Sequence, residues 1–465
     1  MKILDLGQYT SFPFRYIVRA MKSRFTGLAI LLCAWLLAFH CRAADVEVYE
    51  QEPFNYSATA PRDGVSLLEK QISAGELKAG STDREVIASL LRRLEIPVES
   101  QLLVFSRTSF QRDQISPAHP RALYFNDHCY VGWVPGGLAE ITTLDPVLGP
   151  IFYTFAPAAV RTNAPHYFVR ETDCLRCHGG TFIRGLPGLV ARSTFPDEQG
   201  DPIMRFGSEV VDLRTPFTNR WGGWYVTGFD SESLHRGNRL FPGQSDRPET
   251  NVTHLSDRFD AKRYLAGGSS DIVALLVFEQ QLTVQNTLTR ASLDSRRMLD
   301  YQKKLQVAFK SPVTEELEYD SVKSVFENAA TEVVDDLLFK DEAALPAGIR
   351  GSAAFQKVFL ANARRNRDGN SLKDLELNGH LFRNRCSYLI YSDSFRSLPA
   401  PLKRRIYARL TLALRADEPD PRYAYLDSAE RGRILSIIRE TDPELGSALA
   451  AASSEMAKQP IVGSK

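Results

Sequence analysis

A five-residue run near the middle of the chain has the residue types and spacing of one particular covalent chemistry. It reads Cys174-Leu175-Arg176-Cys177-His178, the pattern C-x-x-C-H. Two thiols separated by two residues can each form a thioether bond to one haem vinyl group, and the His that follows can bind the iron. We therefore predict one covalent haem c, attached at Cys174 and Cys177, with His178 as an axial iron ligand.

Two other chemistries also use a C-x-x-C pair. A dithiol redox motif is typical of a reduced cytosolic protein and a βαβ neighbourhood, and the pattern around Cys174 shows no such neighbourhood. A structural zinc site needs a second Cys or His pair at ligand spacing, whereas the other Cys and His residues stand singly. The His directly after the second Cys favours haem over both alternatives.

The second axial ligand decides what such a haem can do, because two protein ligands suit electron transfer and an open position suits ligand binding. His235 is the favoured candidate, since it follows a Trp/Gly-rich segment and stands beside Gly237 and Asn238 in a polar loop that could fold over a haem edge. The alternatives are His166, Met204 and an open or water-filled position.

The N-terminus has the composition of a targeting signal. Met21 is the better initiator, because a basic stretch with Lys22 and Arg24 follows it, then an apolar run from Leu28 to Phe39 and small residues before a cleavage point after Ala43. We predict that residues 1–43 are a Sec-type signal peptide and that the mature protein is periplasmic with no stable membrane span. An uncleaved membrane anchor is the alternative.

Composition indicates a globular protein of two or three domains: 465 residues, 43% hydrophobic, 24% charged and a net charge of +1. No nucleic-acid partner is expected from that charge. Without the leader, the cysteines outside the haem motif are Cys129 and Cys386. An oxidising compartment permits a disulfide between them, but we favour two buried free thiols, because nothing in the sequence brings them together.

The secondary-structure elements expected before the motif follow from the hydrophobic periodicity and from the turn and capping residues. Thr82 and Glu85 form a capping box ahead of an amphipathic helical pattern. Short apolar and aromatic runs then indicate antiparallel strands, with a hairpin turn at 126–128, over residues 102–105, 122–125, 129–133, 139–143 and 151–155. Their aromatic side chains are expected in the core, with a haem-pocket wall as the alternative.

A second β unit is expected after the motif, over 189–194 and 203–210. The segment Trp221–Gly228 then suggests a twisted sheet edge, or a close backbone approach to something flat. From 271 to about 310 the chain has no Pro or Gly and recurring Leu at helical spacing, and further amphipathic helices follow.

These patterns predict an α+β fold, in which an antiparallel β, possibly PAS-like, haem-bearing N-terminal half precedes a helical C-terminal half. The PAS-like alternative is an analogy of layout only. We divide the chain into a haem c-binding domain at 44–265, a helical domain at 266–452 and a disordered tail at 453–465.

The chain resembles a family of exported bacterial proteins that contain a cytochrome c domain and are mostly uncharacterised. The resemblance spans roughly residues 80–440 and rests on the C-x-x-C-H motif and on the segments 122–127, 130–135, 145–149, 221–228, 235–238, 270–274 and 386–392. It implies export and a haem c site but no reaction. Relatives have His-Met-Gly-Asn where this chain has His235-Arg236-Gly237-Asn238, so the resemblance implies no Met ligand at that position.

The leading functional prediction is a periplasmic monohaem cytochrome that passes single electrons to an unidentified redox partner. A haem-based sensor or ligand-binding module is the second interpretation. A peroxidase-like enzyme is the third, with His235 and Arg236 as the distal acid and base groups. A mainly structural protein that carries haem as a redox tag is the fourth.

Overall fold

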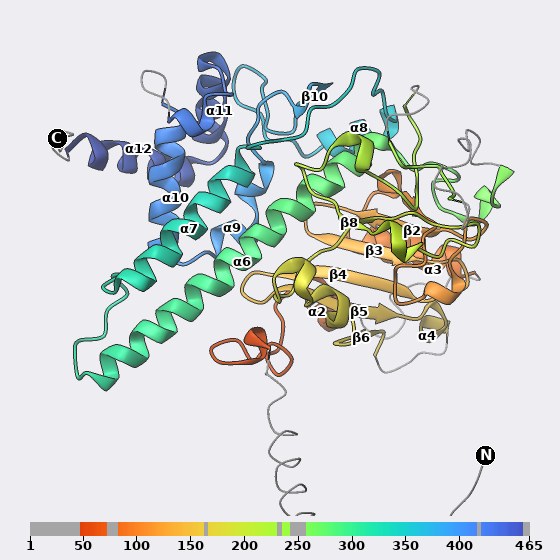
Figure 1. The fold of residues 1–465 in the computed structure, drawn as a ribbon, viewed down its shortest axis with the longest axis horizontal. Coiled ribbons are helices and arrows are strands. Elements are labelled where there is room, and N and C mark those ends of the chain that lie inside the picture. Colours follow the sequence, from red (N-terminus) through yellow and green to blue (C-terminus); the bar gives the residue numbers. More distant parts are fainter. Residues whose placement is uncertain are drawn as a thin grey trace, which may run out of the picture.

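The computed structural model describes residues 47–71, 82–161, 166–229, 235–241, 257–415 and 420–458. A mostly β part, up to residue 229, is followed by a mostly helical part from residue 272 (Figure 1). The predicted α+β class, with antiparallel β structure first and helices second, is confirmed at this level. The predicted leader at 1–43 and the end of the predicted tail lie outside the described residues.

The β part is organised around one antiparallel sheet of seven strands in the order β6-β5-β4-β3-β2-β1-β9. Five of the first six strands match runs predicted from the sequence. At the predicted hairpin turn, the Asn126 side chain accepts hydrogen bonds from the backbone N–H groups of His128 and Cys129. The strands are β1 (Leu102–Val104), β2 (Arg121–Phe125), β3 (Cys129–Trp133), β4 (Ala139–Asp145), β5 (Gly149–Phe155), β6 (Phe168–Arg170) and β9 (Trp224–Tyr225).

The two faces of this sheet pack against different helices. Alternate residues point to opposite faces, so the pair Leu123 and Gly132 lies on the face opposite to the pair Ala122 and Trp133. The face that contains Ala122 shares a core with α2 (Gly64–Gln71) and α3 (Asp83–Arg93). The face that contains Leu123 packs against α6 (Ile272–Ala308). The sheet therefore separates two hydrophobic cores.

The segment between β6 and β9 is mostly irregular. It contains α5 (Leu175–His178) and a two-stranded sheet of β7 (Arg192–Ser193) and β8 (Glu209–Val210), while α4 (Pro157–Arg161) precedes β6. The predicted second β unit is thus much shorter than 189–194 and 203–210 suggested. The sheet edge expected at 221–228 is present as β9, which pairs with β1 more than 100 residues earlier in the chain.

Helix α6 begins at Ile272, close to the predicted start, because the Asp271 side chain caps it by accepting from the N–H of Ala274. The helices that follow are α7 (Asp320–Leu337), α8 (Ala353–Leu360), α9 (Asp393–Arg396), α10 (Ala400–Ala413), α11 (Ser428–Thr441) and α12 (Pro443–Lys458), with a small hairpin of β10 (Leu375–Asn378) and β11 (His380–Phe382) among them.

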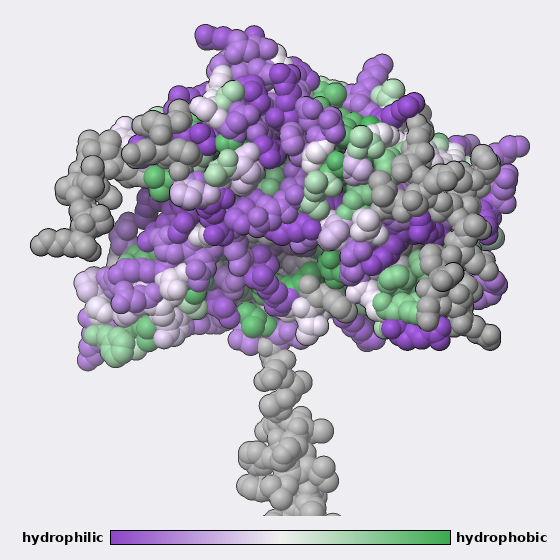
Figure 2. All heavy atoms as spheres, turned by 45° about the horizontal axis from the view of Figure 1, so that its top comes forward, coloured by the Kyte–Doolittle hydropathy of each residue, from purple (hydrophilic) through white to green (hydrophobic). Residues whose placement is uncertain are grey.

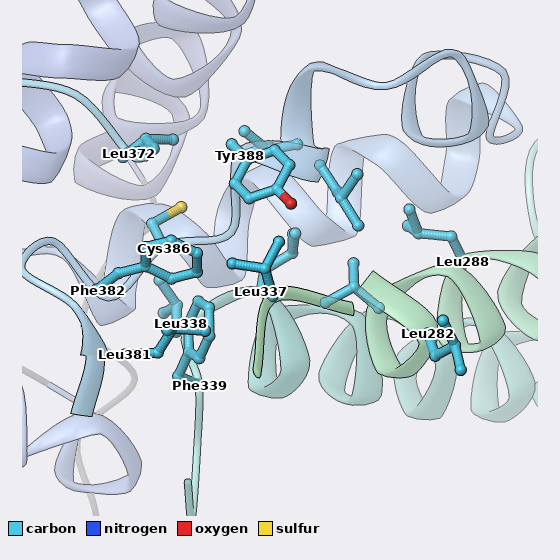
Figure 3. Packing of buried hydrophobic residues seen from close by; sticks show 14 of the residues in the cluster. Leu282, Leu288, Leu337, Leu338, Phe339, Leu372, Leu381, Phe382, Cys386 and Tyr388 are labelled. Atoms are coloured by element: carbon cyan, nitrogen blue, oxygen red, sulfur yellow. The ribbon is translucent and has the colours of Figure 1, made fainter. Parts of the chain in front are cut away.

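One hydrophobic core crosses the predicted domain boundary at residue 265. Figure 3 shows Leu282 and Leu288 of α6 near Leu337 and Tyr388 of the C-terminal half. The same cluster continues through α6 to the sheet residues Leu102, Leu123 and Tyr130. The two parts differ in secondary structure but share this core, while the core on the α3 side of the sheet lies almost entirely within the β part.

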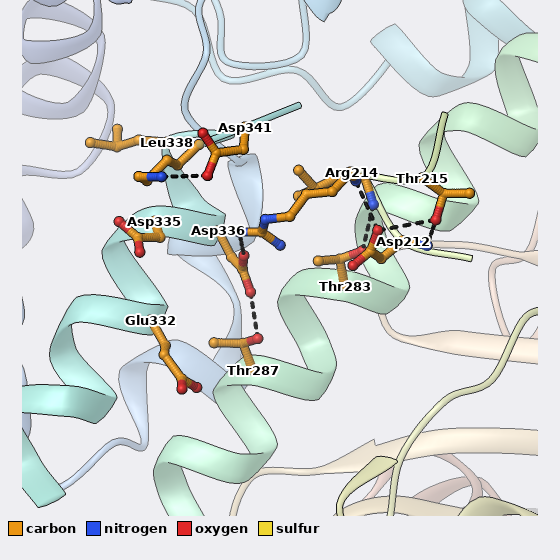
Figure 4. Close-up of polar contacts among 12 residues, drawn as sticks. Asp212, Arg214, Thr215, Thr283, Thr287, Glu332, Asp335, Asp336, Leu338 and Asp341 are labelled. Carbon is orange, nitrogen blue, oxygen red and sulfur yellow. Dashed lines mark hydrogen bonds and ion pairs between the residues drawn. The ribbon is translucent and has the colours of Figure 1, made fainter. Parts of the chain in front are cut away.

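Polar contacts also fasten the β part to the helices (Figure 4). Arg214 reaches Asp336 of α7 at 2.6 Å, and the other oxygen of that carboxylate accepts a hydrogen bond from Thr287 of α6. The backbone N–H of Leu213 donates to Thr283 of α6 at 3.3 Å. Because Asp336 is buried, Arg214 and Thr287 each offset part of the cost of burying its charge.

The predicted tail at 453–465 is wrong in its first residues. Helix α12 runs to Lys458, and the sequence from 453 to 458 contains no Gly or Pro that would stop it. Within the described part of the chain, none of the helices is both long and apolar enough to cross a membrane. Polar side chains cover most of the face drawn in Figure 2.

Candidate haem site

The C-x-x-C-H motif forms a single helical turn. Cys174 occupies the N-cap position of α5, and Cys177 and His178 complete the turn. Positions i, i+3 and i+4 lie on one side of a helix, so both thiols and the imidazole face the same way. The buried Leu175 anchors the turn, Cys174 is partly buried, Cys177 is exposed and both thiols are free. The spacing thus delivers the geometry that haem attachment needs.

The His178 imidazole is held in one tautomer. Its Nδ1 lies 2.8 Å from the carbonyl oxygen of Gly188, and a carbonyl can only accept, so Nδ1 carries the proton. In the neutral ring the lone pair is therefore on Nε2, which is the atom that a metal would take. The backbone N–H of Gly188 donates in return to the carbonyl of His178 at 2.8 Å.

Helix α6 fixes the backbone that orients this ring. Asn286 of α6 accepts from the N–H of Leu189 at 2.7 Å and donates to its carbonyl at 2.8 Å. Gly188 allows this approach, because a Cβ there would lie only 3.0 Å from the Asn286 side-chain oxygen. Partners behind a metal ligand set its orientation and basicity. Asn286 is thus a positioning residue for His178.

The surroundings favour neutral protonation states. Burial lowers the pKa of His178 below its usual value, although the residue as a whole is only half-buried. The Phe152 ring lies 4.8 Å from the His178 ring, centroid to centroid. Burial, and then Glu140 and Glu171, raise the pKa of Cys174 to about 12. A neutral imidazole is the form that binds a metal.

A cavity of about 380 Å³ lies against the motif, and Cys174, Cys177 and His178 are all in its wall. Its volume is within the range of ligand pockets, about 300–1,000 Å³. Helix α6 contributes Phe278 and Leu282 opposite the sheet. The floor is the α6-side face of the sheet, which contributes Val104, Arg121, Leu123, Tyr130, Gly132, Glu140, Thr142 and Phe152.

The floor carries a partly buried ion pair. Arg121 lies 2.7 Å from Glu140, which also accepts from Gln111 at 2.9 Å. The guanidinium group crosses Gly132 so closely that a Cβ there would be 2.1 Å from one of its nitrogens. Arg121 Nε is buried without a hydrogen-bond partner. Arg121 thus places a cation in the cavity wall, and a cation there fits the carboxylates of a porphyrin.

The structure does not bring His235 to this cavity. Its ring lies in an aromatic cage, with centroids 5.2 Å from Trp221, 5.9 Å from Phe217 and 5.7 Å from Phe229. Its Nδ1 accepts from the N–H of Gly237 at 3.0 Å. Burial, and then Arg239, lower its pKa to about 4. The aromatic packing gives His235 a structural place and gives no support to its predicted role as iron ligand.

The alternative ligands are not in the wall either. His166 and Met204 are exposed, with 78% of the His166 side chain and 74% of Met204 accessible. Among the described residues that form the cavity wall, His178 is the only His, and none is a Met.

The leftover cysteines behave as predicted. Cys129 and Cys386 are free and buried, and burial raises the pKa of each thiol to about 12. They belong to different hydrophobic cores, Cys129 on the α3 side of the sheet and Cys386 among the C-terminal helices. The expectation of two free thiols is confirmed.

Sequence reasoning missed several residues of the site. Arg121, Glu140, Gly188 and Asn286 became recognisable only through strand register and the packing of α6. The aromatic wall was anticipated as an alternative to core, and Tyr130, Phe152, Tyr153 and Trp224 do line the cavity.

A second cavity of about 560 Å³ is larger but contains none of the motif residues. Its wall includes the buried Lys373, which pairs with Asp127 at 2.8 Å. No group of three or more His, Cys, Asp or Glu side chains in the described ranges is arranged to hold a metal ion. No family model, curated protein or solved structure matches the chain.

Proposed function

We propose that this chain is an exported monohaem c-type cytochrome that transfers single electrons in the periplasm. Cys174 and Cys177 attach the haem, and His178 binds its iron. One observation carries the proposal: these three side chains share one helical turn in the wall of the 380 Å³ cavity, with Nδ1 of His178 already engaged by Gly188. The bound iron would supply reversible one-electron chemistry to a redox partner.

The other wall residues have definable tasks under this proposal. Phe152, Phe278 and Leu282 exclude water from the ring system. Arg121 presents a cation to the cavity, while Glu140 and Gly132 hold it flat on the sheet. A fixed positive charge near the iron favours the reduced state, so Arg121 should raise the reduction potential.

A ligand-binding haem, as in a sensor or a peroxidase-like enzyme, is the second candidate. It is favoured by the composition of the described wall, where His178 is the only His and no Met is present to bind the iron on its other side. A small external molecule could then bind the iron opposite His178.

Absorption spectra of the exported protein test both candidates. The protein is produced in a host that attaches haem c covalently to exported proteins. Spectra are taken before and after the addition of dithionite, and again after the addition of carbon monoxide. A six-coordinate low-spin haem in both oxidation states supports electron transfer. A five-coordinate reduced form that takes carbon monoxide supports ligand binding.

Variants identify the attachment point in the same experiment. Cys174→Ala with Cys177→Ala should abolish covalent haem, whereas Cys129→Ala removes a thiol outside the cavity and should retain it. Haem retention in the double variant would contradict the proposed attachment.

A further inference from the structure

The second cavity, of about 560 Å³, is formed by both parts of the molecule. Part of its wall comes from the start of α2, the β2–β3 turn and β4, and the rest from α6 and the segments 362–373 and 388–394. None of its wall residues lines the 380 Å³ cavity. The second cavity is therefore separate from the candidate haem site, and its volume is within the range of small-molecule pockets.

Half of the charged side chains in this wall already have partners within the protein. Six of its described residues are Lys, Arg or Asp: Arg62, Asp63, Asp127, Arg364, Lys373 and Asp393. The Lys373 ammonium donates to Asp127 at 2.8 Å and to Asn362 at 2.9 Å. The buried Asp63 carboxylate accepts from the Tyr153 hydroxyl at 2.7 Å and from two backbone N–H groups of α2. Lys373, Asp127 and Asp63 therefore need no ligand.

The other three charged groups keep free hydrogen-bonding capacity. Neither Arg62 nor Asp393 has an ion-pair partner among the described residues, and both are exposed. Arg364 lies 3.7 Å from Asp442, but that carboxylate is paired more closely with Arg396. Exposed charges are often only solvated, but these three belong to the wall of one cavity. Two cations and one anion are thus available to an occupant.

The Arg364 guanidinium is held at the wall by an aromatic ring. It lies over the Tyr391 ring, 4.6 Å from the centroid, and Tyr391 belongs to the same wall. Stacking on a ring leaves the N–H groups at the edge of a guanidinium free for a carboxylate. Asp393 is only two residues beyond Tyr391, so a carboxylate stands near this guanidinium.

The remaining wall suits a small polar molecule. Thr143, Gln285 and Ser371 are buried wall residues with hydroxyl or amide groups. Leu144 and Leu389 add apolar surface that a short aliphatic chain can cover.

We propose that the second cavity binds a free acidic α-amino acid. Such a molecule has two carboxylates and one ammonium group, which complement the two guanidinium groups and the one carboxylate that the wall has available. Arg364 binds the α-carboxylate, Asp393 the neighbouring ammonium group, and Arg62 the side-chain carboxylate. This site is independent of the haem proposal, because the two cavities share no wall residue.

Isothermal titration calorimetry of the purified exported protein with L-glutamate and L-aspartate tests the ligand class. At least one of them should bind about tenfold or more tightly than either of two truncated probes, since each probe lacks one charged contact. The probes are glutarate, which has no ammonium group, and L-glutamine, which has no second carboxylate. The proposal is overturned if neither acidic amino acid binds at millimolar concentration, or if glutarate binds equally well.

Variants test the assigned contacts by the same method. Arg364→Gln should weaken binding of the acidic amino acid about tenfold or more. Arg367→Gln is the matched control and should bind like the wild type, because Arg367 is also exposed and lies 3.9 Å from an acid, Glu440, but is outside the wall. Equal affinities of these two variants would contradict the proposal.

Asp393→Asn separates recognition of the ligand from a general effect on the fold. It should weaken binding of the acidic amino acid and leave binding of glutarate unchanged, because only the amino acid has the ammonium group that Asp393 contacts. An equal loss for both ligands would contradict the proposed contact.

Discussion

Two histidines of this chain, His178 and His235, are both half-buried and both have a pKa lowered by desolvation, yet their surroundings suit different tasks. Nδ1 of His178 donates to a carbonyl, which leaves the lone pair on Nε2 facing a cavity. Nδ1 of His235 accepts from a backbone N–H, so its neutral ring carries the proton on Nε2. Burial alone therefore does not make a histidine suitable as a metal ligand. Suitability depends on which ring nitrogen is already hydrogen-bonded and on whether there is space beside the other one.

The residues around the two histidines differ in a way that agrees with these hydrogen bonds. His178 is at the edge of a cavity wall that includes two thiols and a cation. His235 is enclosed by Phe217, Trp221 and Phe229, whose rings fill the space that a ligand would need. The first region is arranged to receive a group, whereas the second is already packed.

Replacing each histidine in turn should produce the largest difference. His178→Ala removes the proposed iron ligand, so the haem yield should fall sharply and the remaining Soret band should shift. His235→Ala should leave the Soret band unchanged, because the ring is outside the cavity. Absorption spectra of the two purified variants check this, and a change from low to high spin in His235→Ala would restore it as a ligand.

The pH dependence of the free energy of unfolding should reveal the lowered pKa of His235. Its folded pKa is about 4 against about 6.5 for a solvated His. The unfolded chain therefore binds a proton across this window that the folded chain does not. Stability should fall as the pH drops from 6.5 to 4, by up to about 3 kcal/mol, and be unaffected above 6.5.

Urea unfolding at both ends of this window, for the wild type and for His235→Phe, measures the contribution. The phenyl ring keeps the aromatic packing but cannot be protonated, so the variant should lose less stability in acid. Equal losses in the two proteins would show that His235 is not buried as described.

An arginine near each histidine sharpens the contrast. Arg121 and Arg239 both lower the pKa of their neighbouring imidazole. If only His178 binds iron, Arg121→Gln should lower the haem midpoint potential by tens of millivolts, on the order of 1 kcal/mol. Arg239→Gln should leave it unchanged. Redox titration of both variants checks this, and equal shifts would argue against the two separate roles.

Asn286 should give the smallest effect, because it acts on His178 through backbone. In Asn286→Ala the Leu189 backbone loses both side-chain hydrogen bonds, so the imidazole should be protonated and leave the iron at a higher pH in an acid titration. Asn286→Asp keeps the acceptor for the Leu189 N–H and should be intermediate. No change in the titration of the Ala variant would remove Asn286 from this role.

Local signals predicted the elements that local chemistry determines. The alternation along Ala139–Asp145, the Asn126 turn and the Asp271 cap each identify an element without tertiary information. The pairing of β9 with β1 was not predictable, because it joins segments more than 100 residues apart. The start of the predicted tail was misjudged, because a helix of small residues at the end of a chain resembles a disordered segment in composition.

The motif in the sequence was enough to identify one part of the cavity wall, but not the residues that lie across the cavity from it. Cys174, Cys177 and His178 are where a C-x-x-C-H turn requires them. The polar Gly-rich context of His235 suggested an open loop, whereas aromatic residues before and after the Trp/Gly segment fold around it. No sequence pattern marked Arg121 as a site residue, because its position over Gly132 depends on the register between strands β2 and β3.

The intact mass of the exported protein tests the central proposal most directly. From a host with working haem ligation, we expect a single species heavier than the processed polypeptide by one haem, and the Cys174→Ala/Cys177→Ala variant at the mass of the bare chain. A colourless wild-type protein with the mass of the bare chain would contradict covalent attachment at this turn.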